Sequence, residues 1–258
     1  MSSTLVFLVD THAHLCSSDF DQDLGEVLAR TAAAGVEAVI AVGETLADAE
    51  RNLDLAEKFP IVKPAAGLYP TILNCDQAEE MHTFIRRNRA KLAAIGEVGL
   101  DHWAVKEQKD REVQAEIFTE FIRLSKELDL PLNVHSRSAG RDAIGLLMEG
   151  GALRAQLHAF DGKASTAMPA VEAGYFFSIP PSIVRSRQKQ KLVKHLPLGC
   201  LLVETDSPVL GPEPQVRNEP ASLPLAVKAI AEIKGISEQQ VAEAVAANTA
   251  RLYGPHVP

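Results

Sequence analysis

The sequence predicts an α/β fold in which eight parallel strands, each followed by a helix, close into a (β/α)8 TIM barrel. Apolar runs without regular polar alternation, typical of strands buried on both faces, recur eight times along the chain. Helix-like segments separate these runs, as in repeated strand–helix–strand units. Because a barrel of this kind uses about 250 residues, residues 1–258 are expected to form one domain.

The predicted elements follow one another in regular order. Strands are predicted over 5–10, 36–42, 61–68, 91–100, 130–135, 154–160, 174–179 and 199–205. Helices are predicted over 22–34, 45–58, 76–90, 108–128, 138–149, 163–172, 186–196, 221–233 and 237–250. Ser237 and Gln240 form an S-x-x-Q capping box at the start of the last helix. The proline-rich stretch 208–220 is predicted to be a long ordered loop rather than a linker.

Composition narrows the classes of function. The net charge of −8 argues against broad non-specific binding of nucleic acid, although bound cations would offset it locally. No apolar run reaches the roughly 18 residues needed to span a membrane. The first residues lack the basic region of a signal peptide, and three widely spaced cysteines suggest a reducing compartment. We therefore expect a cytoplasmic protein without membrane association, and nothing implies an obligate protein partner.

Six residues that can bind metal stand at the ends of five predicted strands. They are His12, His14, Glu97, His135, His158 and Asp206. Because the carboxyl ends of all strands meet at one face of such a barrel, these side chains are expected to converge. Imidazole and carboxylate groups together form a mixed nitrogen and oxygen site for divalent metal, which is suited to hydrolysis.

Each of these residues also has a simpler explanation when taken alone. His12 and His14 lie two apart in an extended segment, so both imidazoles can reach one ion, whereas a lone histidine more often has a structural role. Glu97, set among apolar residues, can bridge two cations or form a salt bridge inside the barrel. Asp206 can bind metal and accept a proton from water, or form a turn before a Ser-Pro pair. The combination favours the metal site.

Other charged residues near the strand ends are candidates for supporting roles. Glu204 is predicted to orient a ligating histidine from behind it. Arg137, Lys163, Arg185 and Arg187 are predicted candidates to contact a substrate phosphate. Four basic residues in the seven from Arg185 to Lys191 either form a solvated helix face or extend this contact. Arg185 is the strongest candidate of the run because it lies in the loop after the seventh strand.

Five motifs together resemble the TatD family of metal-dependent deoxyribonucleases, which have amidohydrolase-like barrels. The motifs are D-T-H-A-H-L (10–15), G-E-V-G-L-D (96–101), N-V-H-S-R (133–137), H-A-F-D-G (158–162) and E-T-D-S-P (204–208). The resemblance covers the whole chain and is strongest to one branch of the family, which includes a human member. It implies two divalent ions, of Zn²⁺, Mg²⁺ or Mn²⁺, that share one bridging carboxylate. The implied ligands are His12, His14 and Asp206 for one ion, His135 and His158 for the other, and Glu97 for both.

The resemblance also implies hydrolysis of DNA phosphodiesters, with exonuclease action on single-stranded ends by water activated between the two ions. Glu97 and Asp206 would be the catalytic residues, with Asp206 accepting the proton of the water. The family commonly has a histidine that contacts the substrate phosphate after the third strand, where this chain has Tyr69. A tyrosine hydroxyl donates one hydrogen bond but carries no positive charge, so phosphate affinity or substrate preference is expected to differ. Trp103 can stack on a base or serve as a packing residue.

Two other functions remain open at this stage. Similar barrels hydrolyse aminoacyl-tRNA esters, amides or lactones, and many amidohydrolase barrels bridge their metals with a carboxylated lysine. Glu97 stands at that strand end here, which favours the TatD interpretation. A metal-stabilised binding protein without turnover is the other alternative, and the six intact ligands argue against it.

Overall fold

Eight parallel strands, paired in chain order, form the centre of the computed structural model, which describes residues 7–254 and residue 257. The strands are β1 (Leu8–Ala13), β2 (Val36–Ala41), β3 (Val62–Ala66), β4 (Ala94–Gly99), β5 (Leu132–His135), β6 (Ala155–Leu157), β7 (Phe176–Ile179) and β8 (Leu201–Val203). Every neighbouring pair from β1 to β8 is parallel. This topology confirms the predicted α/β class.

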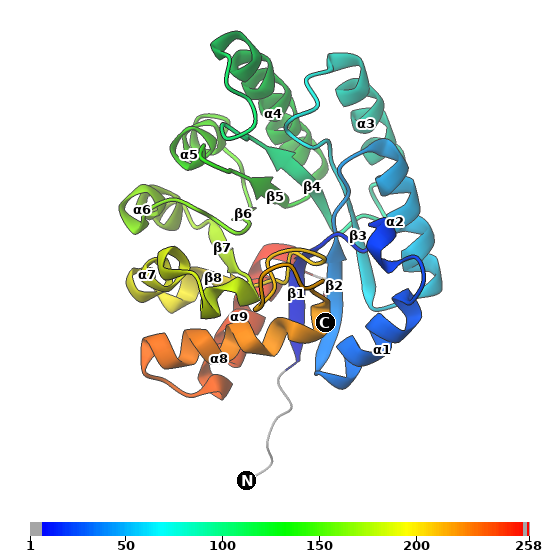
Figure 1. The fold of residues 1–258 in the computed structure, drawn as a ribbon. Coiled ribbons are helices and arrows are strands. Elements are labelled where there is room, and N and C mark those ends of the chain that lie inside the picture. The colour runs from blue at the N-terminus through cyan, green and yellow to red at the C-terminus, as the bar shows by residue number, and fades with distance from the viewer. Residues whose placement is uncertain (1–6, 255–256, 258) are drawn as a thin grey trace.

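Helices follow the strands and surround them (Figure 1). They are α1 (Leu24–Ala33), α2 (Leu46–Lys58), α3 (Cys75–Asn88), α4 (Gln108–Leu128), α5 (Gly140–Glu149), α6 (Ala164–Glu172), α7 (Arg187–His195), α8 (Leu223–Lys234) and α9 (Glu238–Tyr253). Short 3-10 turns cover Ser18–Phe20, Pro181–Val184, Leu198–Cys200 and Pro220–Ser222. The predicted capping box is present at the start of α9, where Ser237 and Gln240 satisfy each other's backbone N–H groups.

Hydrogen bonds between the first strand and the segment after the last one complete the ring. The Asp206 N–H donates to the His12 carbonyl and the His14 N–H to the Ser207 carbonyl, both at 2.8 Å. Thr11 Oγ1 donates to the Val203 carbonyl at 3.0 Å. The predicted TIM barrel is therefore confirmed, and its closure places two candidate metal ligands, His12 and Asp206, side by side.

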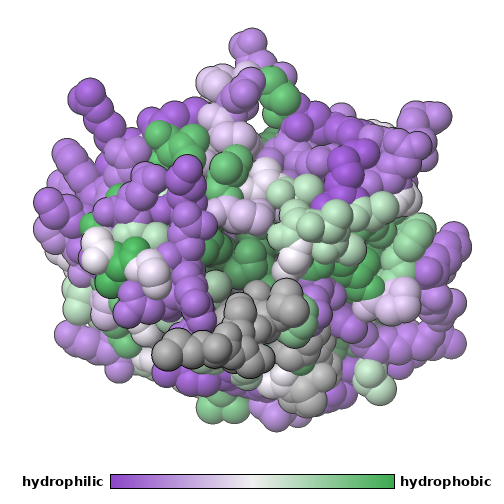
Figure 2. All heavy atoms as spheres, turned by 90° about the horizontal axis from the view of Figure 1, so that it is seen from below, coloured by the Kyte–Doolittle hydropathy of each residue, from purple (hydrophilic) through white to green (hydrophobic). Residues whose placement is uncertain are grey.

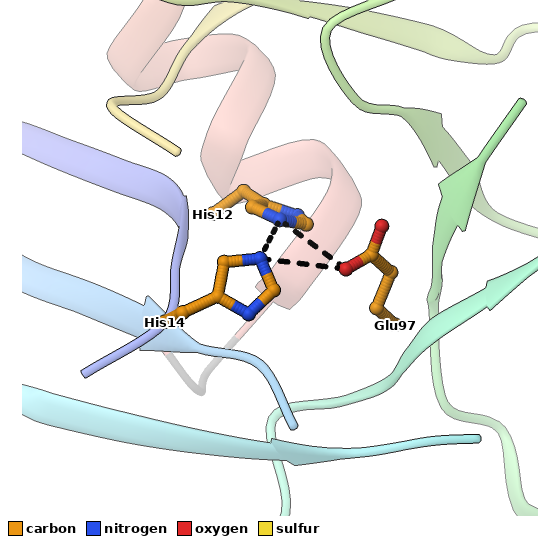
Figure 3. A group of neighbouring side chains, drawn as sticks. All are labelled: His12, His14 and Glu97. Carbon is orange, nitrogen blue, oxygen red and sulfur yellow. Dashed lines mark hydrogen bonds and ion pairs between the residues drawn. The ribbon is translucent and has the colours of Figure 1, made fainter. Parts of the chain in front are cut away.

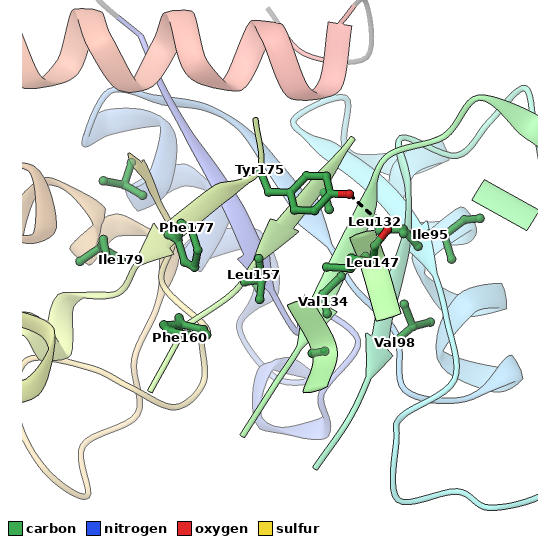
Figure 4. Packing of buried hydrophobic residues seen from close by; sticks show 14 of the residues in the cluster. Ile95, Val98, Leu132, Val134, Leu147, Leu157, Phe160, Tyr175, Phe177 and Ile179 are labelled. Carbon is green, nitrogen blue, oxygen red and sulfur yellow. Dashed lines mark hydrogen bonds between the residues drawn. The ribbon is translucent and has the colours of Figure 1, made fainter. Parts of the chain in front are cut away.

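The main core lies between the sheet and the helices. Ile95, Leu132, Val134 and Phe177 are fully buried there with Leu147 of α5 (Figure 4). The hydroxyl of Tyr175 reaches the end of the same helix and donates to the Leu147 and Ala152 carbonyls. Because close-packed interiors hold their side chains in fixed positions, this layer provides a rigid frame for the strand ends.

Helix α9 sends one aromatic side chain to the barrel interior. Leu252 and Tyr253 are completely buried in a second cluster with Val9 and other strand residues. The Tyr253 hydroxyl lies 2.8 Å from Gln156 Oε1 and 3.2 Å from Asn133 Nδ2. The end of the chain therefore takes part in the polar network beneath the candidate site.

Element boundaries differ from the predicted ones mainly at the strand ends. The first strand was expected over 5–10. Residues 5 and 6 lie outside the described part of the chain, and β1 continues to Ala13, so His12 is inside the strand. The apolar pattern does not show where backbone pairing stops. Here the hydrogen bonds to Asp206 and Ser207 keep the chain extended beyond residue 10. The stretch 208–220 is an ordered loop: Arg217 pairs with Asp23, and Asn218 donates to the Thr205 carbonyl.

Among the described residues, no helix is both long and apolar enough to cross a membrane. On the face in Figure 2, hydrophilic residues predominate around the edge and hydrophobic ones gather toward the middle.

Candidate active site

A pocket of about 450 Å³ lies at the carboxyl ends of the strands. Its walls include five of the residues predicted as metal ligands, together with Tyr69 and Arg137. The sixth, His12, is completely buried behind the pocket. The structure thus brings together all six predicted ligands, from the ends of β1, β4, β5 and β6 or just beyond them, and from the segment after β8.

One group of ligand atoms gathers around the outer oxygen of Glu97. The Nε2 atoms of His12 and His14 are 3.2 Å apart and point toward Glu97 (Figure 3). Glu97 Oε2 lies 3.4 Å from His14 Nε2 and 3.8 Å from His12 Nε2. Asp206 Oδ1 is 3.4 Å from both imidazole nitrogens. Four donor atoms from three parts of the chain therefore surround one point.

A second group gathers around the other oxygen of the same carboxylate. Glu97 Oε1 lies 2.5 Å from His135 Nδ1 and 2.8 Å from His158 Nε2. These two nitrogens are 3.1 Å apart. The His158 ring also stacks on His12, with the ring centroids 3.8 Å apart. Each oxygen of Glu97 thus belongs to a different set of histidines, as the resemblance implied.

The residues present fit divalent metal. Ligands that hold one ion at about 2.0–2.2 Å lie about 3.3–3.6 Å apart in a tetrahedral arrangement. The atoms of the first group, 3.2–3.8 Å apart, are close to this spacing, whereas those of the second group lie closer together, at 2.5–3.1 Å. Glu97 Oε2 is buried and has no hydrogen-bond donor among the described residues. A buried carboxylate oxygen without a partner is unfavourable, and a cation held between Glu97 and the histidines would satisfy it. His12, His14, Asp206 and Glu97 would hold one ion, and His135, His158 and Glu97 a second.

The pKa values of the site residues are shifted because carboxylates and imidazoles lie close together in a buried place. Burial by itself would raise the pKa values of Glu97 and Asp206, but the adjacent histidines outweigh burial and hold both pKa values well below their ordinary range. Burial would lower the pKa of His12 and His135, yet neighbouring carboxylates raise the pKa to about 10 and about 9. Burial and the charge of His12 lower the pKa of His158 to about 4. Divalent cations would replace these imidazole protons as the balance for the carboxylates.

Two buried polar residues fix which nitrogen each histidine presents. Asn133 Nδ2 donates to the Thr11 carbonyl at 2.8 Å, so its Oδ1 faces His12 Nδ1, also at 2.8 Å. His12 Nδ1 therefore carries the proton, and Nε2 is left to bind metal. Asp101 Oδ2, 3.1 Å from His135 Nε2, fixes the opposite choice there and leaves Nδ1 free. Neither residue was predicted to have a role, although Asp101 closes the G-E-V-G-L-D motif and Asn133 opens N-V-H-S-R.

We expect Asn133→Ala to weaken metal binding by about 10–100-fold, because groups that orient a ligating histidine typically contribute this much. The measurement is metal affinity by competition with a chelator. Gln156→Ala is a matched control, since Gln156 is buried in the same network and donates to Thr11 Oγ1 and Ser178 without touching a ligand ring. Equal losses in both variants would mean that Asn133 has only a packing role.

Glu204 hydrogen-bonds the backbone after His158 rather than an imidazole. Its Oε1 accepts a hydrogen bond from the Ala159 N–H at 2.7 Å, and its Oε2 accepts one from Ser178 Oγ. Ala159 has a φ of 40°, a left-handed conformation that is unfavourable for a residue with a Cβ. Glu204 is thus hydrogen-bonded to the backbone that follows His158, although one of its oxygens also lies within 4.8 Å of ring nitrogens of His12 and His158. Its predicted role in orienting a ligating histidine stays a prediction.

Two backbone positions in the site accept geometry that most residues avoid. Asp206 has a φ of 51°, which aspartate tolerates better than most residues. Gly99 has a φ of 140°, and a Cβ there would lie 2.1 Å from the His135 carbonyl oxygen. Only glycine allows β4 and β5 to approach this closely next to two ligands.

The predicted substrate contacts lie in different places. Tyr69 and Arg137 line the pocket, and the Tyr69 ring lies edge-on to His135 with centroids 5.2 Å apart. Arg185 is exposed and lines a neighbouring hollow of about 370 Å³ that shares Val209 and Leu210 with the pocket. The structure therefore does not bring Arg185 to the metal ligands, because its Nε is turned toward the Gly211 carbonyl.

Trp103 and Lys189 take positions that the sequence left undecided. Trp103 is 56% exposed, so it is not a core packing residue, and the Arg137 guanidinium lies 3.8 Å from its ring centroid. Lys189 is buried, lines the pocket and donates to the Ala159 carbonyl at 3.0 Å. Lys189 belongs to the basic run from Arg185, whose pattern alone did not tell which member turns inward. Glu44, which also lines the pocket, had no signal in the sequence beyond its place after β2.

Comparison with known proteins identifies the family. The family model described as "TatD related DNase" matches residues 9–254. The chain belongs to the TatD family. Deoxyribonuclease TATDN3 of Homo sapiens is 46% identical over 98% of this chain and 97% of its own length. The uncharacterized metal-dependent hydrolase YabD of Bacillus subtilis is 34% identical over 95% of this chain and 98% of its own.

A solved structure agrees with this assignment. The TatD homolog YJJV from Escherichia coli superimposes with a TM-score of 0.90 at 28% identity, over 98% of this chain and 100% of that one. Membership in the TatD family confirms the predicted family, the barrel and the hydrolase class. The number and identity of the ions, and the roles of the single residues, remain predictions.

Proposed function

We propose that this TatD-family hydrolase is a deoxyribonuclease that removes nucleotides from single-stranded DNA ends with two divalent ions. The observation that carries the proposal is the division of ligand atoms between the two oxygens of Glu97, at the floor of an open pocket. Relatives named deoxyribonucleases support DNA as the substrate. Zn²⁺, Mg²⁺ and Mn²⁺ are the candidate ions, and the nitrogen-rich ligand set favours Zn²⁺ or Mn²⁺ over Mg²⁺.

The residues of the chain divide the work of hydrolysis. Divalent ions would lower the pKa of a water molecule at the ligand groups and neutralise charge that builds up on the phosphate. Asp206 is ionised, lies 3.4 Å from both imidazoles of the first group and accepts the proton of this water. The water oxygen bonds to phosphorus as the bond to the leaving sugar oxygen breaks, so a phosphate monoester and a free hydroxyl result.

Three residues of the pocket hold the phosphate. Burial and the charge of Glu97 raise the pKa of Tyr69, so its hydroxyl keeps the proton and donates a hydrogen bond to a phosphate oxygen. Arg137, which follows β5, and Lys189 of α7 supply positive charge. Arg137 also stacks against Trp103, which positions an aromatic surface for a base beside the pocket.

Tyr69→His should lower the KM for oligonucleotides by a few-fold, because an imidazole can offer a stronger, charged donor at a gain of roughly 1 kcal/mol. Steady-state kinetics on a labelled single strand measures this change. Tyr69→Phe, which removes the hydroxyl and keeps the ring, should raise KM instead. If KM and kcat stay unchanged in both variants, Tyr69 does not touch the substrate.

A substrate panel tests the proposed function directly. Metal-free protein is loaded with Mg²⁺, Mn²⁺ or Zn²⁺ and incubated with 5′-labelled single-stranded DNA, duplex DNA, aminoacyl-tRNA and small esters or lactones. We expect stepwise shortening of the single strand and little turnover of the others. Preferred hydrolysis of aminoacyl-tRNA or small esters would favour the alternative hydrolase, and unchanged substrates with all three metals would favour a binding protein.

We also place the enzyme in the cytoplasm, as one domain over the whole chain and without an obligate partner. Three free cysteines support a reducing compartment: Cys16 and Cys200 are buried, and Cys75 is exposed.

A further inference from the structure

A second and larger hollow opens beside the candidate active site, between α6 and α7. It has a volume of about 860 Å³, and its walls come from the loop after β6 and from both helices. We call it the α6–α7 groove; its lining residues include Lys163, Met168, Arg187, Lys191 and Leu192. The two helices lie side by side at the left of Figure 1.

The groove adjoins the active-site pocket. Asp161 borders both hollows. Gln188 of α7 donates to the Gly162 carbonyl at 2.7 Å, and the Asp161 carboxylate accepts a hydrogen bond from the Ser138 N–H at 2.9 Å. These bonds fix the loop after β6 as the boundary between pocket and groove. A chain that leaves the pocket past Asp161 therefore enters the groove.

The cations of the groove lack acidic partners. Within residues 7–254, Lys163, Arg187 and Lys191 take part in no ion pair, whereas Arg30 and Arg217 on the other side of the barrel are paired with carboxylates. Arg187 and Lys191 are four residues apart on α7, so they share one face of the helix and line the groove. Lys189 stands midway between them in sequence and lines the active-site pocket instead. One helix thus presents positive charge to the pocket and to the groove.

Charge is divided unevenly between the two sides of the barrel despite the net charge of −8. Residues 135–196, from the end of β5 through α7, contain nine Lys and Arg against four Asp and Glu. Residues 14–60, from the end of β1 through α2, contain ten Asp and Glu against three Lys and Arg. These segments lie on opposite sides in Figure 1. A polyanion that enters the pocket is attracted to the α5–α7 side and repelled from the other.

We propose that the α6–α7 groove binds the single-stranded DNA backbone next to the nucleotide whose phosphodiester is cleaved. Arg187, Lys191 and Lys163 would contact phosphates, and the partly exposed Met168 would meet the apolar face of a base or sugar. The inference rests on the proposed deoxyribonuclease function and adds to it a site outside the metal ligands. Its consequence is that long strands bind better than substrates small enough for the pocket alone.

The salt dependence of binding tests the groove. Metal-loaded wild-type protein and the double variant Arg187→Glu/Lys191→Glu are titrated into a fluorescent phosphorothioate single strand, which resists hydrolysis, at several salt concentrations. Each phosphate contact contributes a slope of about −0.7 to log Kobs against log salt. We expect the double variant to reduce the magnitude of the slope by about 1.4, for two contacts, and to weaken binding at least tenfold.

Lys58→Glu/Lys228→Glu is the matched control, because it makes the same change in net charge at two exposed lysines outside the groove. It should change the slope by less than half as much. Hydrolysis of bis(4-nitrophenyl) phosphate, which needs only the pocket, should stay within about twofold in both double variants. Equal slopes in the groove and control variants would overturn the groove site while leaving the deoxyribonuclease function intact. Failure of wild-type protein to bind or cleave the single strand would instead reject both proposals.

Discussion

Asp206→Asn should lower DNA cleavage by about 10²–10⁴-fold, the usual contribution of a positioned acid–base group. Asparagine keeps the shape and one oxygen donor of aspartate but cannot accept the proton near neutral pH. Because Asp206 Oδ1 lies 3.4 Å from the Nε2 atoms of both His12 and His14, partial binding of the first ion should survive. The substrate Kd should change much less, since His135, His158 and Glu97 are unchanged. Single-turnover cleavage and metal content are measured on the same sample.

Glu204→Gln is the control for this substitution. It makes the same chemical change two residues away, at a buried carboxylate that bonds the Ala159 N–H and Ser178 instead of the ligand groups. A smaller loss of turnover is expected there. Near wild-type cleavage by Asp206→Asn at full metal content would remove Asp206 from proton transfer. Loss of all metal would make it a ligand only, and Glu204 would become the next candidate for the proton acceptor.

Glu97→Ala should abolish both activity and metal binding, because one carboxylate serves both groups of ligands. Glu97 Oε1 contacts His135 and His158, and Oε2 faces His12 and His14. The fold should persist, since the apolar layer between strands and helices does not include this side chain. Elemental analysis of the purified variant, with circular dichroism to check folding, measures the outcome.

Glu97→Gln tests whether metal binding needs both oxygens of the Glu97 carboxylate. Glutamine is the same size but has one carbonyl oxygen and an amide nitrogen that cannot bind a cation. We expect the glutamine variant to keep at most one ion per chain, and the alanine variant none. Two ions per chain in the alanine variant would show that Glu97 does not bridge them.

The order of strands and helices was predictable because each barrel unit is local in sequence. Buried parallel strands need apolar side chains on both faces, and the helices between them show their own amphipathic period. The eight runs and their intervening helices therefore appear directly in the sequence, with errors only at the ends. Strand 154–160 shortened to Ala155–Leu157 because pairing with β7 stops before His158.

The convergence of the six ligands was predictable for a related reason. In a barrel of parallel strands, every carboxyl end faces the same side, so residues such as His14, His135 and His158 meet whatever the details of packing. The topology of the barrel alone therefore predicts that these candidate ligands lie close together. The match of each Glu97 oxygen to its own histidines followed from family resemblance and agrees with the distances found.

Only the tertiary structure decided which polar side chains support the site. Asn133 and Asp101 face His12 Nδ1 and His135 Nε2 through contacts 121 and 34 residues apart in sequence, and so leave the other nitrogen of each ring for the proposed ions. Lys189 rather than Arg185 reaches the pocket, since the direction of a long side chain depends on the neighbours that pack around it. Hydrophobic pattern and strand order are properties of the sequence itself. The orientation of a polar side chain depends on partners from distant segments, so it is determined only in the closed barrel.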